Sequence, residues 1–350
     1  MKMKLRAIAL AGCAALALGV AACGSSDKNS TSSGSSSTAN AAPKGKPIKV
    51  GLVTDIGGLN DRSFNHLAYV GLQRAQKELG IQGRVLTSKS AADYIPNLTT
   101  LAQQKYDLII PVGFLMADAT DAVAKQVPTA KFAMVDVDAA SLKGKPTNVE
   151  GLLFKEQEAG YLVGYLAGLY AKDNNIKAVS SVGGQKIPPV DHYIAGFQAG
   201  AKAADPGITT LNGYSQDFVA QDKCKEIALN QIAKGSKVVF QVAGQCGLGA
   251  LDAAKEKGAQ GIGVDADQGY LGPYILSSAQ KKVDVAVFNA IKAAQAGQFQ
   301  GGQDIINQLS NNGVGFGKLN AAGQKYQAQV QKVADDIKSG KIKNIPDTVK

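Results

Sequence analysis

From residue 47 to residue 338, short apolar runs alternate with longer amphipathic segments, and little else lies between them. Several of the apolar runs are rich in Val and Ile without polar alternation, as is typical of strands covered on both faces. Glycines such as Gly80 and Gly297 stand directly after helix-like segments, where helices commonly end. The alternation and the length predict a doubly wound α/β chain with two sheets.

The positions of the predicted elements follow from this pattern. Strands are expected at Ile48–Thr54, Arg84–Leu86, Leu108–Val112, Lys131–Val135, Val149–Phe154, Ala178–Val182, Lys237–Val242, Gly261–Asp265 and Tyr274–Ser277. Helices are expected at Asn60–Leu79, Ile95–Gln104, Ala117–Gln126, Glu156–Ala171, Tyr193–Ala203, Asp222–Ala233, Leu248–Lys257, Lys281–Ala296 and Ala321–Lys338.

The domain boundary is expected at Gly151–Gly160, where a strand runs directly into a helix rich in small residues. Changes of pattern at 277–281 and 313–319 predict that the chain crosses between lobes twice more. Three crossings between two Rossmann-like lobes, with a three-strand hinge, is the architecture of type I periplasmic binding proteins. We therefore expect an N-terminal lobe of residues 47–155 plus 279–315, and a C-terminal lobe of residues 156–278 plus 316–350.

The first residues have the features of an export signal. Three basic residues precede an apolar stretch, Ala7–Val20, that is short for a bilayer span. Small residues then lead to Cys23 in a pattern that resembles the lipobox of bacterial lipoproteins. This predicts a signal peptide at 1–22, lipidation of Cys23 and a flexible Ser/Gly-rich linker up to residue 46. The alternative is an ordinary secretory signal with a chance cysteine. The lipoprotein interpretation places the protein on the extracytoplasmic face of the cell membrane, held there by its lipid anchor.

The formal net charge of +10 includes three signal residues, which leaves +7 for the rest of the chain. The lysines are scattered and form no basic block with interleaved aromatic residues, so nucleic-acid binding is not expected. A basic surface near an anionic membrane is the simpler interpretation.

Two cysteines, Cys224 and Cys246, lie outside the signal and the lipobox. Cys224 opens a predicted helix, and Cys246 follows the next predicted strand. Since these points lie at the same edge of a wound sheet, a disulfide between them is expected in an oxidising compartment. Two free buried thiols are the alternative.

The motifs of several enzyme classes are missing from the sequence. A phosphate-binding loop, a dinucleotide fingerprint and a His-rich cluster are not found, and the chain has only His66 and His192. We therefore expect no cofactor, no metal site and no enzymatic activity.

The segment Thr54–Asn65 carries the most specific chemistry. It follows a predicted strand and precedes a predicted helix, at the sheet edge where open α/β folds bind ligands. A carboxylate (Asp55), an aromatic ring (Phe64) and an amide (Asn65) gather there. Together they suit a flat small molecule with polar edges.

Several motifs, read in order, resemble the basic membrane protein family of bacterial solute-binding lipoproteins, which includes the purine nucleoside receptor A type. The resemblance covers essentially all of residues 48–295, and the segments that carry it are Asp55–Asn65, Val112–Ala119, Phe132–Asp136, Glu158–Gly168, Gly183–Gly184, Gly196–Gly200, Val239–Gly244, Gly263–Gln268 and Ser277–Asp284. The resemblance implies the extracytoplasmic binding subunit of an ABC importer, with a separate permease and ATPase as partners. Its ligand would be a nucleoside bound in the cleft between the lobes.

The resemblance also implies roles for individual residues. Asp55 and Asn65 would bind the polar edge of a purine, Phe64 and Phe240 would stack on its two faces, and Asp265 and Lys281 would contact the ribose. The full set of ligand-binding residues so implied is Asp55, Phe64, Asn65, Phe114, Asp118, Phe240, Gly244, Asp265 and Lys281. Several have a simpler structural alternative. Asp55 and Asp265 could cap turns, Phe64 and Phe240 could be core residues, and Asn65 and Lys281 could be exposed residues at helix starts.

Residues 243–247 depart from the family pattern, and Gln245 could alter specificity from the sugar side of the cleft. Three alternative functions stay open. They are the same fold with a sugar or another small metabolite, a surface receptor or adhesin without a transport role, and a secreted nucleoside-processing enzyme.

Overall fold

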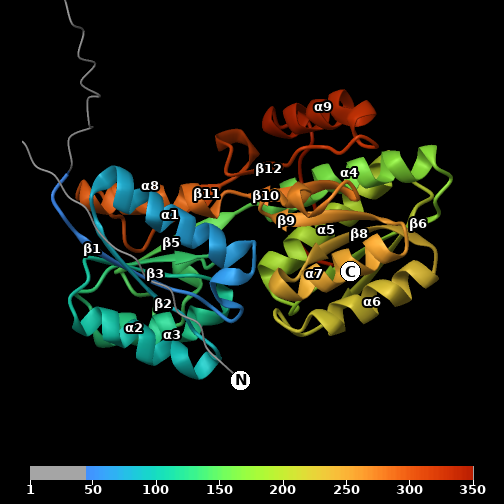
Figure 1. Cartoon of the computed structure of the whole chain (residues 1–350). Coiled ribbons are helices and arrows are strands. Elements are labelled where there is room, and N and C mark those ends of the chain that lie inside the picture. Colours follow the sequence, from blue (N-terminus) through green and yellow to red (C-terminus); the bar gives the residue numbers. More distant parts are fainter. Residues whose placement is uncertain (1–44, 350) are drawn as a thin grey trace, which may run out of the picture. The chain divides into compact units, whose positions relative to one another are not determined.

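The computed structural model describes residues 45–349, and these form two α/β lobes with a six-stranded sheet each (Figure 1). The predicted signal peptide, Cys23 and nearly all of the predicted linker lie outside the described residues. Among the described residues, no helix combines the length and the apolar character that a membrane crossing requires.

The first lobe contains an all-parallel sheet in the order β11-β5-β4-β3-β1-β2. Its strands are β1 (Lys49–Val53), β2 (Gln82–Leu86), β3 (Leu108–Pro111), β4 (Phe132–Val135), β5 (Val149–Phe154) and β11 (Asp304–Asn307). Its helices are α1 (Phe64–Leu79), α2 (Tyr94–Gln103), α3 (Ala117–Gln126) and α8 (Val283–Gln295). Helices α1 and α8 pack on one face of the sheet, and α2 and α3 on the other (Figure 1).

The second lobe repeats the plan with the order β12-β10-β9-β8-β6-β7. Its strands are β6 (Ala178–Gly183), β7 (Thr209–Tyr214), β8 (Ser236–Val242), β9 (Gln260–Asp265), β10 (Ile275–Lys281) and β12 (Val314–Phe316). All pairs are parallel except β12 with β10. The helices are α4 (Glu156–Asp173), α5 (Pro188–Ala204), α6 (Gln221–Ala233), α7 (Gly244–Glu256) and α9 (Gln327–Lys338).

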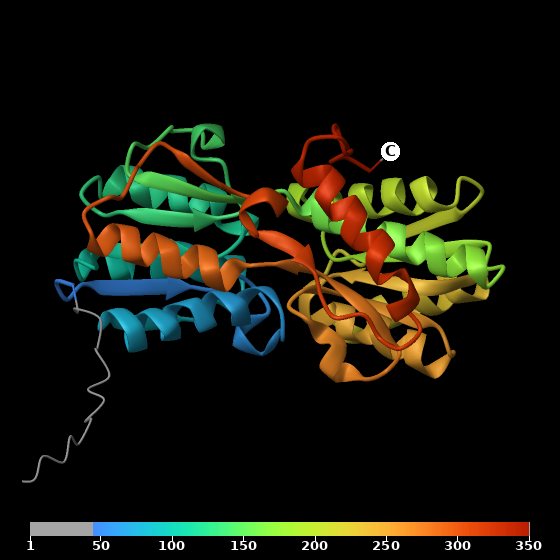
Figure 2. The same cartoon turned by 90° about the horizontal axis from the view of Figure 1, so that it is seen from above.

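The chain crosses between the lobes three times, after β5, after β10 and between β11 and β12 (Figure 2). Two boundaries differ slightly from the prediction. Ala279–Lys281 pairs with β12 inside the second sheet, so the second crossing comes after Lys281 and not before residue 279. Strand β12 begins at Val314, which places residues 314 and 315 in the second lobe as well.

Three strands were not predicted, and all three are edge strands. None of the residues of β7 or β11 is fully buried, and β12 is only three residues long. Edge strands of this kind lack the continuous apolar run that identifies a central strand. The largest differences among the helices are at two starts. Helix α5 begins at Pro188 and not at Tyr193, because proline is favoured in the first turn of a helix. Helix α9 begins at Gln327 and not at Ala321.

Helices α4 and α5 pack closely because small residues line both of their contact surfaces. A Cβ atom on Gly160 would collide with the carbonyl oxygen of Tyr193, and one on Gly164 with that of Phe197. On the other helix, Gly196 lies equally close to Gln157. This close approach matters for the site, because α4 begins with Glu156 and α5 carries His192 and Tyr193.

Candidate functional site

A cavity lies where the carboxyl ends of strands from the two sheets meet. Asp55 and Asp136 follow β1 and β4 of the first lobe, while Asp265 and Lys281 end β9 and β10 of the second. All four line a cavity of about 70 Å³, several times the roughly 10–15 Å³ that one enclosed water needs. Open α/β sheets bind ligands at such strand ends.

Most of the residues that the sequence assigns to ligand binding line this cavity. They are Asp55, Phe64, Asn65, Phe114, Gly244, Asp265 and Lys281. The structure therefore brings together side chains that are more than 200 residues apart in the sequence.

Asp118 and Phe240 do not reach the cavity. The Asp118 side chain is 81% exposed on α3 and forms an ion pair of 2.9 Å with Lys143. The Phe240 side chain has no exposed surface, and its ring packs at 5.1 Å from the ring of Phe197. It points from the middle of β8 into the core under α5, as mid-strand aromatic residues commonly do. Neither residue is placed to touch a ligand, so both assignments are corrected.

Asp55 and Asn65 form a tight pair on the first lobe. The Asn65 amide donates to Asp55 Oδ1 at 2.7 Å, and the backbone amide of Asp55 donates to Asn65 Oδ1 at 3.2 Å. Burial raises the pKa of Asp55 well above its usual range, although the hydrogen bond from Asn65 opposes this. Gly113 makes room for the pair, because a Cβ there would lie 2.6 Å from Asp55 Oδ2. The pair presents a polar edge that can both donate and accept hydrogen bonds.

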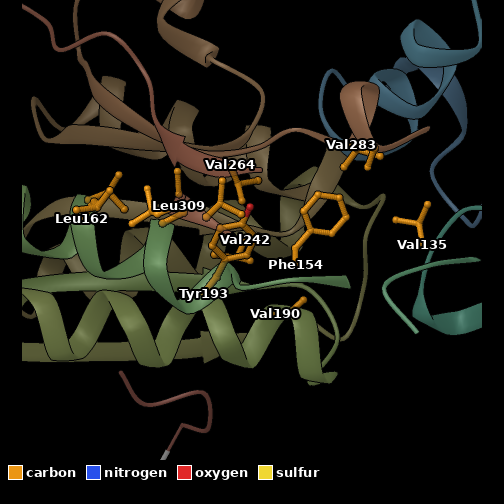
Figure 3. Packing of buried hydrophobic residues seen from close by; sticks show 14 of the residues in the cluster. Val135, Phe154, Leu162, Val190, Tyr193, Val242, Val264, Val283 and Leu309 are labelled. Carbon is orange, nitrogen blue, oxygen red and sulfur yellow. The ribbon is translucent and has the colours of Figure 1, made fainter. Parts of the chain in front are cut away.

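Aromatic side chains of both lobes line the cavity. Phe64 begins α1 and Phe114 follows β3, and both are half-buried. In the second lobe Tyr193 and Phe218 take the place that the sequence analysis gave to Phe240. Figure 3 shows Tyr193 rising from α5 toward Val242 and Val264.

Lys281 is the centre of a buried ionic cluster. Its Nζ lies 2.6 Å from Asp136 Oδ1 and 2.8 Å from Glu156 Oε1. The other Glu156 oxygen lies 3.1 Å from His192 Nδ1. The Lys281 ammonium also lies 5.0 Å from the centre of the Phe64 ring, within range of a cation–π interaction. Because a lysine has only three donors, most of its bonding capacity is used inside the protein.

The cluster perturbs the pKa of each member. Burial raises the pKa of Asp136 to about 7, although the charge of Lys281 works against this shift. Burial also opposes the charged form of Glu156, but Lys281 and His192 outweigh it and the pKa of Glu156 is lowered. The pKa of Lys281 is raised, because the surrounding carboxylates outweigh the effect of burial.

Asp265 connects the lobes. Its Oδ2 accepts a 2.6 Å hydrogen bond from Ser63 of the first lobe, and its Oδ1 accepts one of 3.1 Å from Tyr193. Asp265 and Asp136 both have left-handed backbone conformations, with φ of 59° and 68°. Non-glycine residues of this kind are uncommon and often occur at functional sites. Here they end strands of opposite lobes and turn their carboxylates toward the cavity.

Sequence reasoning missed several residues of the site, namely Ser63, Asp136, Glu156, Tyr193 and Phe218. Asp136 carried a signal, because it is the first acidic residue after a predicted strand. Tyr193 and Phe218 lie on a helix and a loop whose local sequences do not show which side chains turn inward.

The opposite wall contains Gly244 and Gln245, the first two residues of α7. Next to them, Cys246 forms a disulfide with Cys224 at the start of α6. The Cα atoms of this pair are 5.6 Å apart, and neither cysteine has exposed surface. Within the described part of the chain, no group of three or more His, Cys, Asp or Glu side chains is placed to hold a metal ion.

Comparison with solved structures gives the same fold. A solute-binding protein of an ABC transporter system from Aeropyrum pernix aligns with a TM-score of 0.77 and 29% identity, covering 86% of this chain and 94% of that one. A second such protein, from Conexibacter woesei, aligns with a TM-score of 0.69 and 23% identity, covering 86% and 100% of the two chains.

Comparison of sequences finds relatives of higher identity. An uncharacterised lipoprotein of Pyrococcus horikoshii is 37% identical over 319 residues, which cover 87% of this chain and 76% of that protein. A protein of Lactococcus lactis named ABC transporter nucleoside-binding protein BmpA is 35% identical over 317 residues, which cover 84% and 88%.

Members of this group are solute-binding proteins and not enzymes. Such proteins capture a small molecule outside the cytoplasm for a permease and an ATPase. Residues 48–348 match the family described as ABC transporter substrate-binding protein, PnrA-like, and the chain belongs to this Bmp family.

Proposed function

We propose that this protein binds a nucleoside, with a purine base, in the cavity between its lobes. The observation that carries the proposal is the combination of aromatic rings from both lobes with a carboxylate–amide pair. Phe64 and Phe218 suit the faces of a flat base, and Asp55 with Asn65 suits its polar edge. Stacking buries apolar surface, while paired edge contacts select one base over another.

Asp265 is proposed to accept hydrogen bonds from the ribose hydroxyls. Its carboxylate already bonds Ser63 and Tyr193, and its remaining lone pairs face a cavity that it lines. The name of the Lactococcus relative, which refers to nucleoside binding, supports this choice of ligand.

The charges favour a nucleoside over a nucleotide. Lys281 is the one cationic side chain among the described residues that line the cavity, and two carboxylates already bond it. A phosphate group would therefore meet acidic side chains without a cation free to bind it.

Calorimetry with a panel of ligands tests the proposal. Inosine, guanosine and adenosine should bind with one ligand per protein, whereas ribose alone and the matching 5′-monophosphates should bind at least about tenfold more weakly. Tight binding of arabinose or glucose, with none of any nucleoside, would show that the ligand is a sugar. Conversion of a nucleoside to free base would instead show an enzyme.

The same proposal includes a lipid anchor at Cys23 that holds the protein on the extracytoplasmic face of the membrane. It is supported by the order of basic, apolar and small residues before Cys23 and by relatives that are named lipoproteins. Metabolic labelling with palmitate should be lost in Cys23→Ser, with release of the protein from the membrane fraction. Cys13→Ser is the matched control and should keep both the label and the anchor.

A further inference from the structure

Phe218 lies in the loop between β7 and α6, and residues far apart in the sequence hold it in place. Its ring packs against Gly184 so closely that a Cβ atom on that residue would collide with it. Its carbonyl oxygen accepts a 3.0 Å hydrogen bond from the amide of Cys246. The Phe218 backbone is thus hydrogen-bonded to one of the two disulfide cysteines.

The two ends of this loop are fixed differently. At the start, the amides of Ser215 and Gln216 donate to the carbonyls of Gly183 and Gly184, at 2.9 and 3.1 Å. These bonds continue the β6–β7 pairing. They hold the backbone before Phe218 but not after it.

After Phe218 the loop has few apolar anchors of its own. The Asp217 carboxylate accepts from the amides of Val219 and Ala220, which shapes the turn, and its Oδ2 accepts a 2.8 Å hydrogen bond from Lys223 in the first turn of α6. These contacts are polar and partly exposed, and they do not reach α7. Val219 is 39% exposed. The loop then enters α6, and Cys224 in the first turn of this helix is bonded to Cys246 in the first turn of α7.

The disulfide therefore fixes the far end of the loop to the helix that forms the adjoining wall. Gly244 and Gln245 of that helix line the cavity beside Phe218. Gln221, at the start of α6, also packs closely against Gly249 of α7, in line with the same docking of the two helix ends. The disulfide thus constrains both the end of the loop that carries Phe218 and the start of α7, which carries Gly244 and Gln245.

We propose that the Cys224–Cys246 disulfide is a positioning element of the ligand site, which holds the Phe218 ring where it contacts the ligand. The proposal rests on the proposed nucleoside function for the identity of the ligand. It assigns the disulfide a role in binding that is separate from its contribution to global stability.

A double-mutant cycle in the full chain tests it, with inosine as the probe and calorimetry as the readout. The four proteins are the wild type, Phe218→Ala, Cys224→Ala/Cys246→Ala, and the combined variant. Loss of a stacked ring should raise Kd by about 5- to 150-fold in Phe218→Ala. Removal of the disulfide should raise Kd by about tenfold in the wild type but by less than about twofold in the Phe218→Ala background.

The outcomes separate the two proposals. If the wild type binds no nucleoside, the proposed function fails, and the role of the disulfide in nucleoside binding fails with it. If the wild type binds and the disulfide-free variant binds equally well, the positioning role is wrong. An equal loss in both Phe218 backgrounds also contradicts it, because a purely structural effect would not depend on this ring.

A second variant keeps the test decisive if the disulfide-free protein folds poorly. Two glycines inserted after Val219 leave both cysteines in place but loosen the connection from Phe218 to α6. This variant should raise Kd by a similar factor at an unchanged melting temperature. Wild-type affinity in it would overturn the proposal.

Discussion

The hydroxyl of Ser63 in the first lobe donates a 2.6 Å hydrogen bond to the carboxylate of Asp265 in the second. It also lies 3.3 Å from the carbonyl oxygen of Val264. Ser63 directly precedes Phe64, and Asp265 ends β9. The two lobes are therefore joined directly at the proposed ligand site, so a contact that closes the cleft also places residues for the ligand.

Ser63→Ala should weaken ligand binding by loosening this junction. A hydrogen bond to a carboxylate contributes about 1.5–3 kcal/mol, so Kd should rise by about 10- to 150-fold. The change should appear mainly as faster dissociation, measured by stopped-flow or surface plasmon resonance. Ser141→Ala, at an exposed serine of the first lobe that does not line the cavity, is the control and should bind like the wild type. Unchanged kinetics in Ser63→Ala would mean that this contact does not hold the closed state.

A pair of Phe→Leu substitutions should separate a ligand-contacting ring from a core ring. Phe64→Leu keeps apolar volume but removes the stacked ring, and should weaken nucleoside binding by about 1–3 kcal/mol. Phe240 is fully buried between Phe197 and Tyr193, so Phe240→Leu should lower the melting temperature and leave Kd nearly unchanged. Calorimetry and thermal unfolding on both variants check this. The reverse pattern would restore the role that the sequence analysis gave to Phe240.

The central strands and the first-lobe residues of the site could be predicted because their signals are local. Asp55, Phe64 and Asn65 lie within one strand–turn–helix segment, whose apolar run and glycines fix the fold of that segment. The second lobe is harder, since Phe240 lies within β8 and Phe218 in the loop after β7, and neither local sequence shows which ring faces the cavity. Only the packing of α5 over β8 decides that the first is core and the second lines the cavity.

Edge strands were missed for a related reason. Strand β11 exposes Ile305 and Ile306 and joins the sheet only through β5, far away in the sequence. Such pairing depends on tertiary context more than on local propensity.

The buried acid Asp136 should make the protein less stable as the pH rises. Its pKa is raised from an ordinary value of 3.8 to about 7, chiefly by burial, so the folded state holds its proton more tightly than the unfolded state. Between about pH 4 and pH 7 Asp136 is ionised in the unfolded state but protonated in the folded state. The free energy of unfolding therefore falls by up to about 1.4 kcal/mol per pH unit for such a group. Below that window both states are protonated, and above it the loss is complete.

Urea unfolding at intervals from pH 4.5 to pH 8 measures this slope. Asp136→Asn removes the titrating group and should flatten the slope between pH 5 and pH 7, whatever its effect on absolute stability. His192 and Asp265 also have raised pKa values and act in the same direction, so a residual slope is expected. Asp118→Asn, on the exposed surface, is the control and should keep the full slope. Equal slopes in the wild type and Asp136→Asn would show that Asp136 does not hold a proton in the folded state.

Gly184→Ala should act on the ligand site without touching the ligand. A Cβ at this position would overlap the Phe218 ring, and Gly184 has no positive φ, so the backbone itself accepts alanine. The Phe218 ring must then shift. Because the hydrogen bond from the Cys246 amide to the Phe218 carbonyl holds the loop backbone in place, we expect the ring to move toward the cavity. We expect binding to weaken by up to the contribution of one stacked base, about 1–3 kcal/mol, with little loss of thermal stability. Gly315→Ala is the matched control, since nothing lies within 4 Å of a Cβ there. If Gly184→Ala binds like this control, Phe218 does not form the wall against which the ligand rests.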